Sequence, residues 1–271
     1  MGLNNSSIGV FDSGIGGLTV VKTIAELMPN EDIVYFGDIA RLPYGTKSVA
    51  TIRKFTYQTV KFLLQQNVKA IVIACNTISA VALAEVLQLA GDTPVVNVIS
   101  ACSATLSNNS KSRRVGVIAT PATVTSMAYP RAIKNLNDEL QVLQVACTLF
   151  VPLIEEGYLV HQALDIIAGE YLAPLIKANI DTLVLGCTHY PLIRPTLEKI
   201  MGDNVTIVDP AIATANELHS ILQQKQLFNQ NLKPAQYEFY VTELSPNFNK
   251  IGEIFLNRRL SSPKLINLEP I

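Results

Sequence analysis

Short runs of apolar, mostly β-branched residues alternate along the chain with longer segments in which apolar residues recur every three or four positions. The runs predict β-strands at Ile8–Phe11, Ile33–Phe36, Ala70–Ala74, Val95–Ile99, Val115–Ala119, Val142–Ala146, Thr182–Gly186 and Val205–Val208. The periodic segments predict α-helices at Leu18–Met28, Val49–Gln66, Ile78–Leu89, Val124–Asn135, Leu159–Ala178, Thr196–Met201 and Ala211–Gln224. Strands that are apolar throughout are buried on both faces. The alternation therefore predicts an α/β fold with parallel sheets covered by helices.

The second half of the chain repeats the pattern of the first. The segment 69–77, which ends in Cys75-Asn76-Thr77, aligns with 180–188, and 8–13 aligns with 115–120 in the same order and at nearly the same offset. We therefore expect two similar α/β domains related by pseudo-symmetry. The predicted limits are 1–98 plus 209–271 for the first and 99–208 for the second. The break falls near residues 98–112, where Ser107–Ser112 is the most polar stretch.

Length, composition and charge exclude several classes of protein. A chain of 271 residues with 49% hydrophobic and 16% charged residues can bury a large core, in one large domain or two modest ones. No apolar run approaches the ~20 residues of a membrane span. Lys plus Arg number 21 against 22 for Asp plus Glu, so there is no basic excess to bind nucleic acid. The first residues lack a basic signal-peptide region, and we expect a cytoplasmic protein without membrane or nucleic-acid partners.

The cysteines and histidines do not form a metal-binding pattern. The four cysteines are far apart, with no C-x-x-C pair, and the three histidines lie at unrelated places. We therefore expect no metal, and free thiols that are either buried or reactive.

Two of the cysteines hold equivalent positions in the repeat. Cys75 and Cys187 each end an apolar strand and precede a predicted helix, and ligands of open α/β sheets bind at that edge. A helix N-terminus there would lower the pKa of each thiol. A single cysteine at a strand end is more often buried filler, but two at equivalent positions favour a functional role. Cys102 and Cys147 lack this setting and are expected to be core or surface residues.

A glycine-rich loop, 12–17, follows the first strand. Its glycine spacing does not match a dinucleotide-binding fingerprint. The glycines allow a tight turn that presents Asp12 and Ser13 at the carboxyl edge of the sheet. Simple capping of the next helix is a compatible alternative.

Five further sequence segments carry a resemblance to a known family. They are 9–14 (GVFDSG), 35–45 (YFGDIARLPYG), 74–77 (ACNT), 151–157 (VPLIEEG) and 186–191 (GCTHYP). In this order they resemble the signatures of the glutamate racemase family, and the similarity spans nearly the whole chain. The resemblance implies interconversion of L- and D-glutamate without a cofactor, in a cleft between the two domains. It also implies that the product D-glutamate supplies peptidoglycan synthesis.

The resemblance also implies roles for individual residues. Cys75 would deprotonate D-glutamate and Cys187 L-glutamate, as two bases on opposite faces of Cα. Asp12 and His189 would tune the thiols or hold the ammonium group, and Glu155 would assist on the Cys187 side. The remaining residues expected to bind substrate are Ser13, Pro43, Tyr44, Gly45, Asn76, Thr77 and Thr188.

Other functions remain open at this point. A racemase of the aspartate or hydantoin type, or a one-cysteine decarboxylase, would keep the fold and change the substrate or reaction. A non-catalytic two-domain protein that closes on an acidic ligand is a different class. The sequence does not fix the oligomeric state, and a homodimer is one option.

Overall fold

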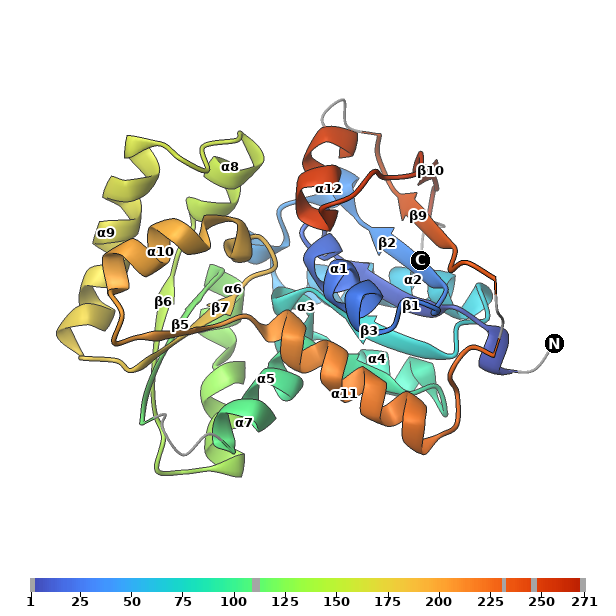
Figure 1. The fold of residues 1–271 in the computed structure, drawn as a ribbon, viewed down its shortest axis with the longest axis horizontal. Helices are drawn as coiled ribbons and strands as arrows, with labels where there is room; N and C mark the ends of the chain where they lie inside the picture. The colour runs from blue at the N-terminus through green and yellow to red at the C-terminus, as the bar shows by residue number, and fades with distance from the viewer. Residues whose placement is uncertain (1–2, 109–112, 231–232, 245–247, 269–271) are drawn as a thin grey trace.

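Two parallel β-sheets, each flanked by helices, form the two lobes of the computed structural model, which describes residues 3–108, 113–230, 233–244 and 248–268 (Figure 1). The first lobe holds a six-stranded sheet in the order β10-β9-β2-β1-β3-β4, and the second lobe a four-stranded sheet in the order β6-β5-β7-β8. All of their strand pairs are parallel. The predicted fold class is thus confirmed.

Eight of the ten strands in the described part of the chain lie close to predicted places, and β9 and β10 were not predicted. The strands are β1 Ile8–Asp12, β2 Ile33–Gly37, β3 Ala70–Ile73, β4 Val95–Asn97, β5 Arg114–Ala119, β6 Gln141–Ala146, β7 Thr182–Gly186, β8 Thr206–Val208, β9 Tyr237–Val241 and β10 Lys264–Leu265. Every residue of β1, β2, β3 and β7 is buried, as expected for strands covered on both faces.

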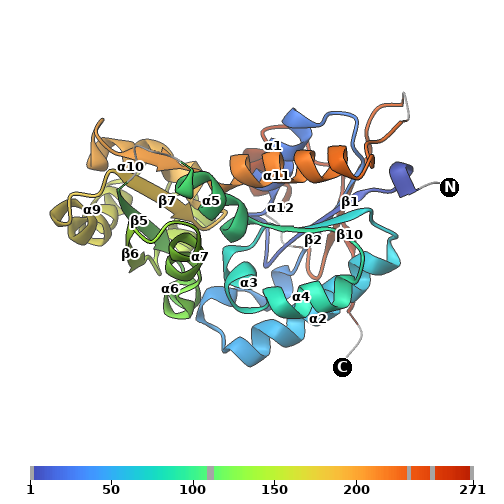
Figure 2. The ribbon, with the colours of Figure 1, turned by 90° about the horizontal axis from the view of Figure 1, so that it is seen from below.

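The helices cover both faces of the two sheets (Figures 1 and 2). They are α1 Leu18–Leu27, α2 Val49–Gln65, α3 Asn76–Val81, α4 Leu83–Ala90, α5 Val98–Ser107, α6 Pro121–Ser126, α7 Ala128–Leu136, α8 Phe150–Glu155, α9 Gln162–Lys177, α10 Arg194–Met201, α11 Pro210–Gln224 and α12 Phe248–Leu256. In the described part of the chain, none of them has the length and apolar character needed to cross a membrane.

The internal repeat is visible in the sheets themselves. The order β2-β1-β3-β4 in the first lobe corresponds strand by strand to β6-β5-β7-β8 in the second. The registers also correspond, because Ile8 pairs with Ala70 as Val115 pairs with Thr182. Aligning Cys75 with Cys187 makes Ala70 equivalent to Thr182, and aligning 8–13 with 115–120 makes Ile8 equivalent to Val115, so the two cysteines follow equivalent strands.

Two connections between the lobes pass through α5 and α11, which pack against each other (Figure 2). The predicted strand 95–99 was too long, because the Asn97 side chain accepts a hydrogen bond from Ser100 N at 3.0 Å and caps α5 at once. The helix α5 was not predicted. Of the polar stretch expected at the break, residues 109–112 lie outside the described residues, and the domain limits stay a prediction.

Two of the predicted helices are each divided in two. The segment 78–89 breaks at Ala82, where the backbone leaves the helical region, and gives α3 and α4. The segment 124–135 breaks at Met127, whose φ of 56° is left-handed, and gives α6 and α7. Apolar periodicity passes through such one-residue breaks, so it does not reveal them.

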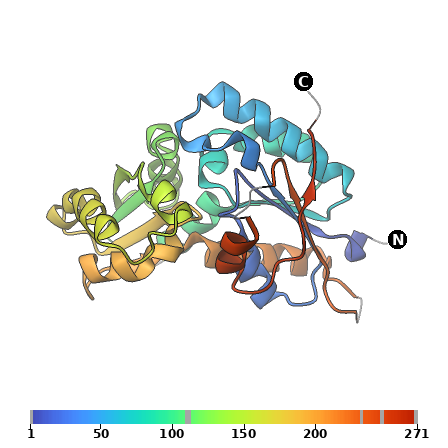
Figure 3. The same cartoon turned by 90° about the horizontal axis from the view of Figure 1, so that it is seen from above.

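The C-terminal segment returns to the first lobe. Strand β9 pairs with β2, and helix α12 packs against α1 (Figure 3). Neither element was predicted. Figure 3 shows α12 on the side of its lobe that faces the other lobe, and this places it beside the cavity described next.

Candidate active site

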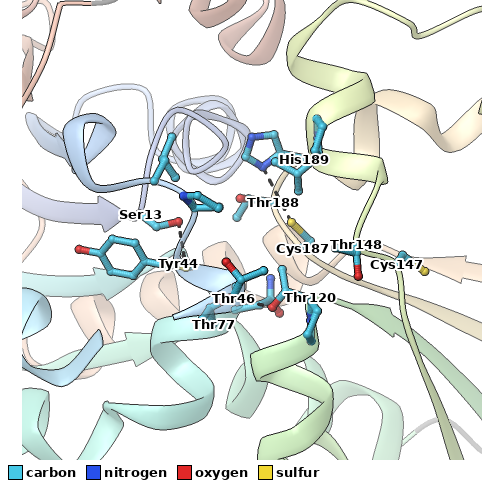
Figure 4. Close-up of a pocket in the computed structure, with 18 of the residues that line it drawn as sticks. Ser13, Tyr44, Thr46, Thr77, Thr120, Cys147, Thr148, Cys187, Thr188 and His189 are labelled. Atoms are coloured by element: carbon cyan, nitrogen blue, oxygen red, sulfur yellow. Dashed lines mark hydrogen bonds between the residues drawn. The ribbon is translucent and has the colours of Figure 1, made fainter. Parts of the chain in front are cut away.

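A cavity of about 380 Å³ lies between the lobes, at the carboxyl ends of the strands. Loops after β1, β3, β5, β6 and β7 contribute to it, together with the loop 42–46 and helix α8. Figure 4 shows Ser13 and Tyr44 on one side of the cavity, and Cys187 and Thr148 on the other. The two lobes therefore enclose one site, as predicted.

All but one of the predicted site residues line this cavity. They are Ser13, Pro43, Tyr44, Gly45, Cys75, Asn76, Thr77, Glu155, Cys187, Thr188 and His189. The exception is Asp12, which is buried behind the lining. Its Oδ2 accepts a hydrogen bond from Thr188 Oγ1 at 3.3 Å, so it still contacts the site across the two lobes.

Sequence reasoning missed several lining residues. They are Leu42, Thr46, Thr120, Pro121, Cys147, Thr148, Val151, Pro152 and Glu156. The repeat carries a signal for Thr120, because it aligns with Ser13 at the end of the first strand. Cys147, left as a core or surface residue, lines the cavity, but Figure 4 shows its sulfur pointing away from Cys187. Burial raises the pKa of the Cys147 thiol.

The Cys75 thiol contacts a neutral hydroxyl and lies near the negative charge of Asp12. Its Sγ donates to Ser13 Oγ at 3.4 Å, and Cys75 itself is the N-cap residue of the short helix α3. Burial raises the pKa of Cys75, the Asp12 carboxylate raises it further, and the value is about 12. The expected lowering by the helix N-terminus is therefore wrong for the substrate-free site, because burial and a negative charge outweigh a helix of six residues.

The Asp12 carboxylate is held by both lobes. Its Oδ1 accepts the Gly14 N–H at 2.9 Å, in addition to the Thr188 hydroxyl on Oδ2. Burial raises the pKa of Asp12, while the His189 charge and these hydrogen bonds oppose the rise. The glycines of this loop are needed for close approach, since a Cβ at Gly16 would lie 2.5 Å from His189 Nδ1.

The Cys187 thiol has a different set of partners. Its Sγ lies 3.8 Å from His189 Nδ1, and His189 Nε2 lies 2.9 Å from Glu155 Oε1. Burial lowers the pKa of His189, but the hydrogen bonds to Cys187 and Glu155 outweigh burial and raise the pKa to about 10. At neutral pH the imidazole is therefore a cation between a sulfur and a carboxylate.

The helix predicted at Thr196–Met201 is α10, which begins two residues earlier, at Arg194. A 3-10 turn, Tyr190–Ile193, lies between Cys187 and this helix, so Cys187 does not directly precede an α-helix. Pro191 and Pro195 fit the first positions of these two elements. The His189 ring is covered from the other lobe by Phe255 of α12, with ring centroids 5.2 Å apart at 82°.

The loop 42–46 is anchored to the first lobe and touches the second. The Tyr44 hydroxyl donates to Asp38, and the Arg41 Nε lies 2.6 Å from the same carboxylate. Gly45 sits against the second lobe, where an added Cβ would lie 2.7 Å from Thr120 Cβ. The backbone of this loop therefore closes one wall of the cavity.

Hydrogen bonds also join the lobes along the floor of the cavity. Thr77 Oγ1 and Thr120 Oγ1 are 2.9 Å apart, and the Tyr129 hydroxyl donates to Asn76 Oδ1 at 2.7 Å. The described residues contain no group of three or more His, Cys, Asp or Glu arranged to hold a metal ion. The site thus offers the Cys75 and Cys187 thiols, hydroxyl and amide donors, and the buried His189 cation.

Comparison with known proteins gives consistent matches. The family model of Asp/Glu/Hydantoin racemases matches residues 8–218. The chain is 49% identical over 261 residues to a glutamate racemase of Neisseria meningitidis, covering 96% of each chain. Its structure is similar to a Francisella tularensis glutamate racemase in complex with D-glutamate, with a TM-score of 0.94, 47% identity and 98% and 99% coverage. A Thermus thermophilus glutamate racemase in complex with β-chloro-D-alanine matches with a TM-score of 0.87, 38% identity and 98% coverage of both chains.

Proposed function

We propose, from the premise that this chain belongs to the Asp/Glu/Hydantoin racemase family, that it interconverts L- and D-glutamate. The observation that carries this proposal is that Cys75 and Cys187, at equivalent strand ends of two similar lobes, line one cavity. The similarity to glutamate racemases over 96% of the chain supports glutamate as the substrate.

The two thiols act as a pair of bases. Inversion at Cα removes a proton from one face and returns a proton to the opposite face. In one direction the Cys75 thiolate takes the proton from D-glutamate, and the Cys187 thiol gives its proton to the other face of the carbanion. In the reverse direction Cys187 takes the proton from L-glutamate and Cys75 supplies one. Each turnover leaves one thiolate and one thiol with their roles exchanged.

The substrate itself would lower the pKa of Cys75. Burial and the Asp12 carboxylate hold the pKa of Cys75 near 12. An α-ammonium group placed beside Asp12 would offset that negative charge and favour the thiolate. Asp12 would therefore bind the ammonium group and prepare the base in the same step.

On the other side, the protein supplies the positive charge. The His189 imidazolium, held by Glu155 at 2.9 Å, lies next to the Cys187 sulfur. It would stabilise the Cys187 thiolate while L-glutamate is bound. The substrate carboxylates would bind to the hydroxyl, amide and backbone donors of Ser13, Tyr44, Gly45, Asn76, Thr77 and Thr188, with the Pro43 ring, which has no donor, lining the same wall.

Two further features belong to the same proposal. The reaction proceeds without a cofactor or metal, with acidity at Cα supplied by desolvation and by preorganised donors. The protein is cytoplasmic, where its four free thiols are typical of a reducing compartment, and it supplies D-glutamate for peptidoglycan. A homodimer stays a prediction.

Circular dichroism of L-glutamate incubated with the purified, exhaustively chelated protein tests the proposal. The signal should decay to zero in buffer without pyridoxal phosphate, and in D₂O the Cα position should take up solvent deuterium. Faster conversion of aspartate or a hydantoin in a substrate panel would favour the related racemases. Binding of glutamate without deuterium uptake would mean a non-catalytic binding protein.

A further inference from the structure

We propose that Tyr129 is a positioning residue that holds the Asn76 side-chain amide with its N–H groups facing the substrate. The inference rests on the proposed function, since it concerns how that site binds a carboxylate. The Tyr129 hydroxyl donates to Asn76 Oδ1 at 2.7 Å. Tyr129 is fully buried and Asn76 is 3% exposed, so water does not compete for this hydrogen bond.

The hydrogen bond fixes which way the amide faces. The Tyr129 hydroxyl has no second hydrogen-bond partner within the described ranges of the chain. Burial raises the pKa of Tyr129 well above its usual value, so the hydroxyl keeps its proton. With the amide flipped, the phenolic proton would lack an acceptor and the amide N–H would face a hydroxyl oxygen. A buried donor without an acceptor is destabilising, so the amide oxygen stays toward Tyr129.

The amide nitrogen is then the group left for the cavity. Among the described residues Nδ2 of Asn76 has no hydrogen-bond partner, yet it is not one of the fully enclosed unpaired polar atoms. Asn76 itself lines the cavity. An NH₂ group offers two donors and no acceptor, which suits a carboxylate and not an ammonium group. Tyr129 thereby makes Asn76 a donor for an anionic part of the substrate.

The same contact links the two lobes. Asn76 begins α3 in the first lobe, whereas Tyr129 lies in α7 of the second, and α3 packs against α7. The donor on one lobe is therefore aligned only while the other lobe is docked against it. The neighbouring Thr77–Thr120 contact at 2.9 Å joins the lobes at the same place.

The variant Tyr129→Phe removes the hydroxyl and keeps the ring. One hydrogen bond contributes about 0.5–1.5 kcal/mol, so the Kd for D-glutamate and both KM values should rise about 2- to 13-fold, with kcat nearly unchanged. In an Asn76→Ala background the same substitution should add nothing. The matched control is Tyr171→Phe, which loses a hydrogen bond to Leu149 N within the second lobe and should leave both constants unchanged.

A second variant tests the direction of the amide even if Tyr129→Phe is unstable. Asn76→Asp retains an oxygen acceptor for Tyr129 but places a second oxygen where Nδ2 lies. Glutamate affinity should fall by more than the Tyr129→Phe change, because two carboxylates would then face each other. Wild-type affinity in Asn76→Asp, or an equal Tyr129→Phe effect with and without Asn76, would overturn the inference.

If the proposed racemase activity is wrong, the experiments give a result different from the one expected if only the role of Tyr129 is wrong. A wild-type protein that takes up no deuterium at Cα is not a racemase, whatever Tyr129 does. The amide can then be followed in ¹⁵N-labelled, ligand-free protein. The Asn76 NH₂ resonances should be split and slow to rotate in the wild type, and should average or shift in Tyr129→Phe. Identical resonances in both proteins would contradict the positioning role.

Discussion

Cys75 and Cys187 occupy equivalent places in two lobes of the same build, but their surroundings carry opposite charge. Cys75 faces Ser13 and the Asp12 carboxylate, and its pKa is raised to about 12. Cys187 faces an imidazolium that Glu155 holds at 2.9 Å. The repeat therefore sets where the thiols lie, while neighbours in space, Asp12 on one side and His189 on the other, set the charge around each. In the proposed mechanism, the Cys75 side takes its positive charge from the substrate, whereas the Cys187 side has the His189 imidazolium.

The largest effect is expected from removing either thiol. Cys75→Ala and Cys187→Ala should each reduce racemisation by at least 10²–10⁴-fold, because net inversion needs both groups. A substrate that eliminates a leaving group from Cβ needs only one base. Cys75→Ala should retain more elimination from its L isomer, and Cys187→Ala more from its D isomer.

The control for these variants is Cys102→Ala. Cys102 is fully buried in α5 and does not line the cavity, so its rates should stay close to wild type. If both mutants retained elimination from the two isomers equally, the thiols would not act on opposite faces.

Disturbing the contact between Gly16 of the first lobe and His189 of the second should have the next largest effect on the rate. In Gly16→Ala the new methyl would clash with Thr188 Oγ1 and lie 2.5 Å from His189 Nδ1, and would displace both the Asp12 partner and the imidazole beside Cys187. A misplacement of about 1 Å costs on the order of 10² in rate, so kcat should fall about 100-fold. Steady-state kinetics of both isomers measures it.

Gly169→Ala is the matched control, since an added Cβ there meets no atom within 4 Å. It lies inside α9 and should instead stabilise the fold by roughly 0.5–1 kcal/mol without changing rates. Wild-type kinetics in Gly16→Ala would show that the His189 position is not critical.

The difference in charge predicts different alkylation of the two thiols. The enantiomers have equal free energies, so kcat/KM must be equal in both directions and cannot reveal the asymmetry.

Iodoacetamide labelling of each cysteine, measured by peptide mass spectrometry, can reveal this difference in charge. Without substrate, Cys75 labelling should rise about tenfold per pH unit from pH 7 to 10, because its pKa lies near 12. Cys187 should be labelled first at pH 7, and glutamate should protect both. Equal rates at all pH values would contradict the comparison.

The smallest effect concerns the stability provided by the Glu155–His189 pair. The pKa of His189 is raised from 6.5 to about 10, so the imidazolium stabilises the fold fully below about pH 6.5 and this is lost as pH rises to about 10. Glu155→Gln should therefore lower the free energy of unfolding by ~1 kcal/mol at pH 7, since Glu155 is 32% exposed and partly screened. The loss should vanish above pH 10 in urea titrations. Glu156→Gln, an exposed neighbour, should show no such pH dependence.

The sequence predicted the elements whose physical signal is local. Buried β-branched strands are continuous apolar runs, and all eight predicted strands exist within two residues of their ends. The predictions that failed concern features that depend on contacts between residues distant in sequence, or on the conformation or hydrogen bond of a single residue. The Asn97 cap ended a strand early, Met127 divided a helix, and β9 gains its place only by pairing with β2.

The same distinction holds for the site. Strand ends and the repeat indicated the two thiols and their polar neighbours. The pKa of Cys75 was wrongly expected to be low, because neither the burial of its thiol nor the approach of the Asp12 carboxylate, distant in sequence, is visible in the local pattern. Cys147 was expected to be a core or surface residue because it lies outside the repeated strand-end positions, and only the fold brings the loop after β6 to the cavity. Tyr129 lies in a helix without any motif, and only the packing of α7 on α3 brings it to Asn76.

The C-terminal return sets a minimum chain length for the site. The family match ends at residue 218, but the ring that covers His189 belongs to Phe255 and the partner of β2 is β9. A chain truncated at 218 would keep every thiol, hydroxyl and carboxylate described above. It would also expose an unpaired β2 edge, which invites aggregation, and open His189 to water. The shortest chain with an intact site therefore extends at least through Phe255.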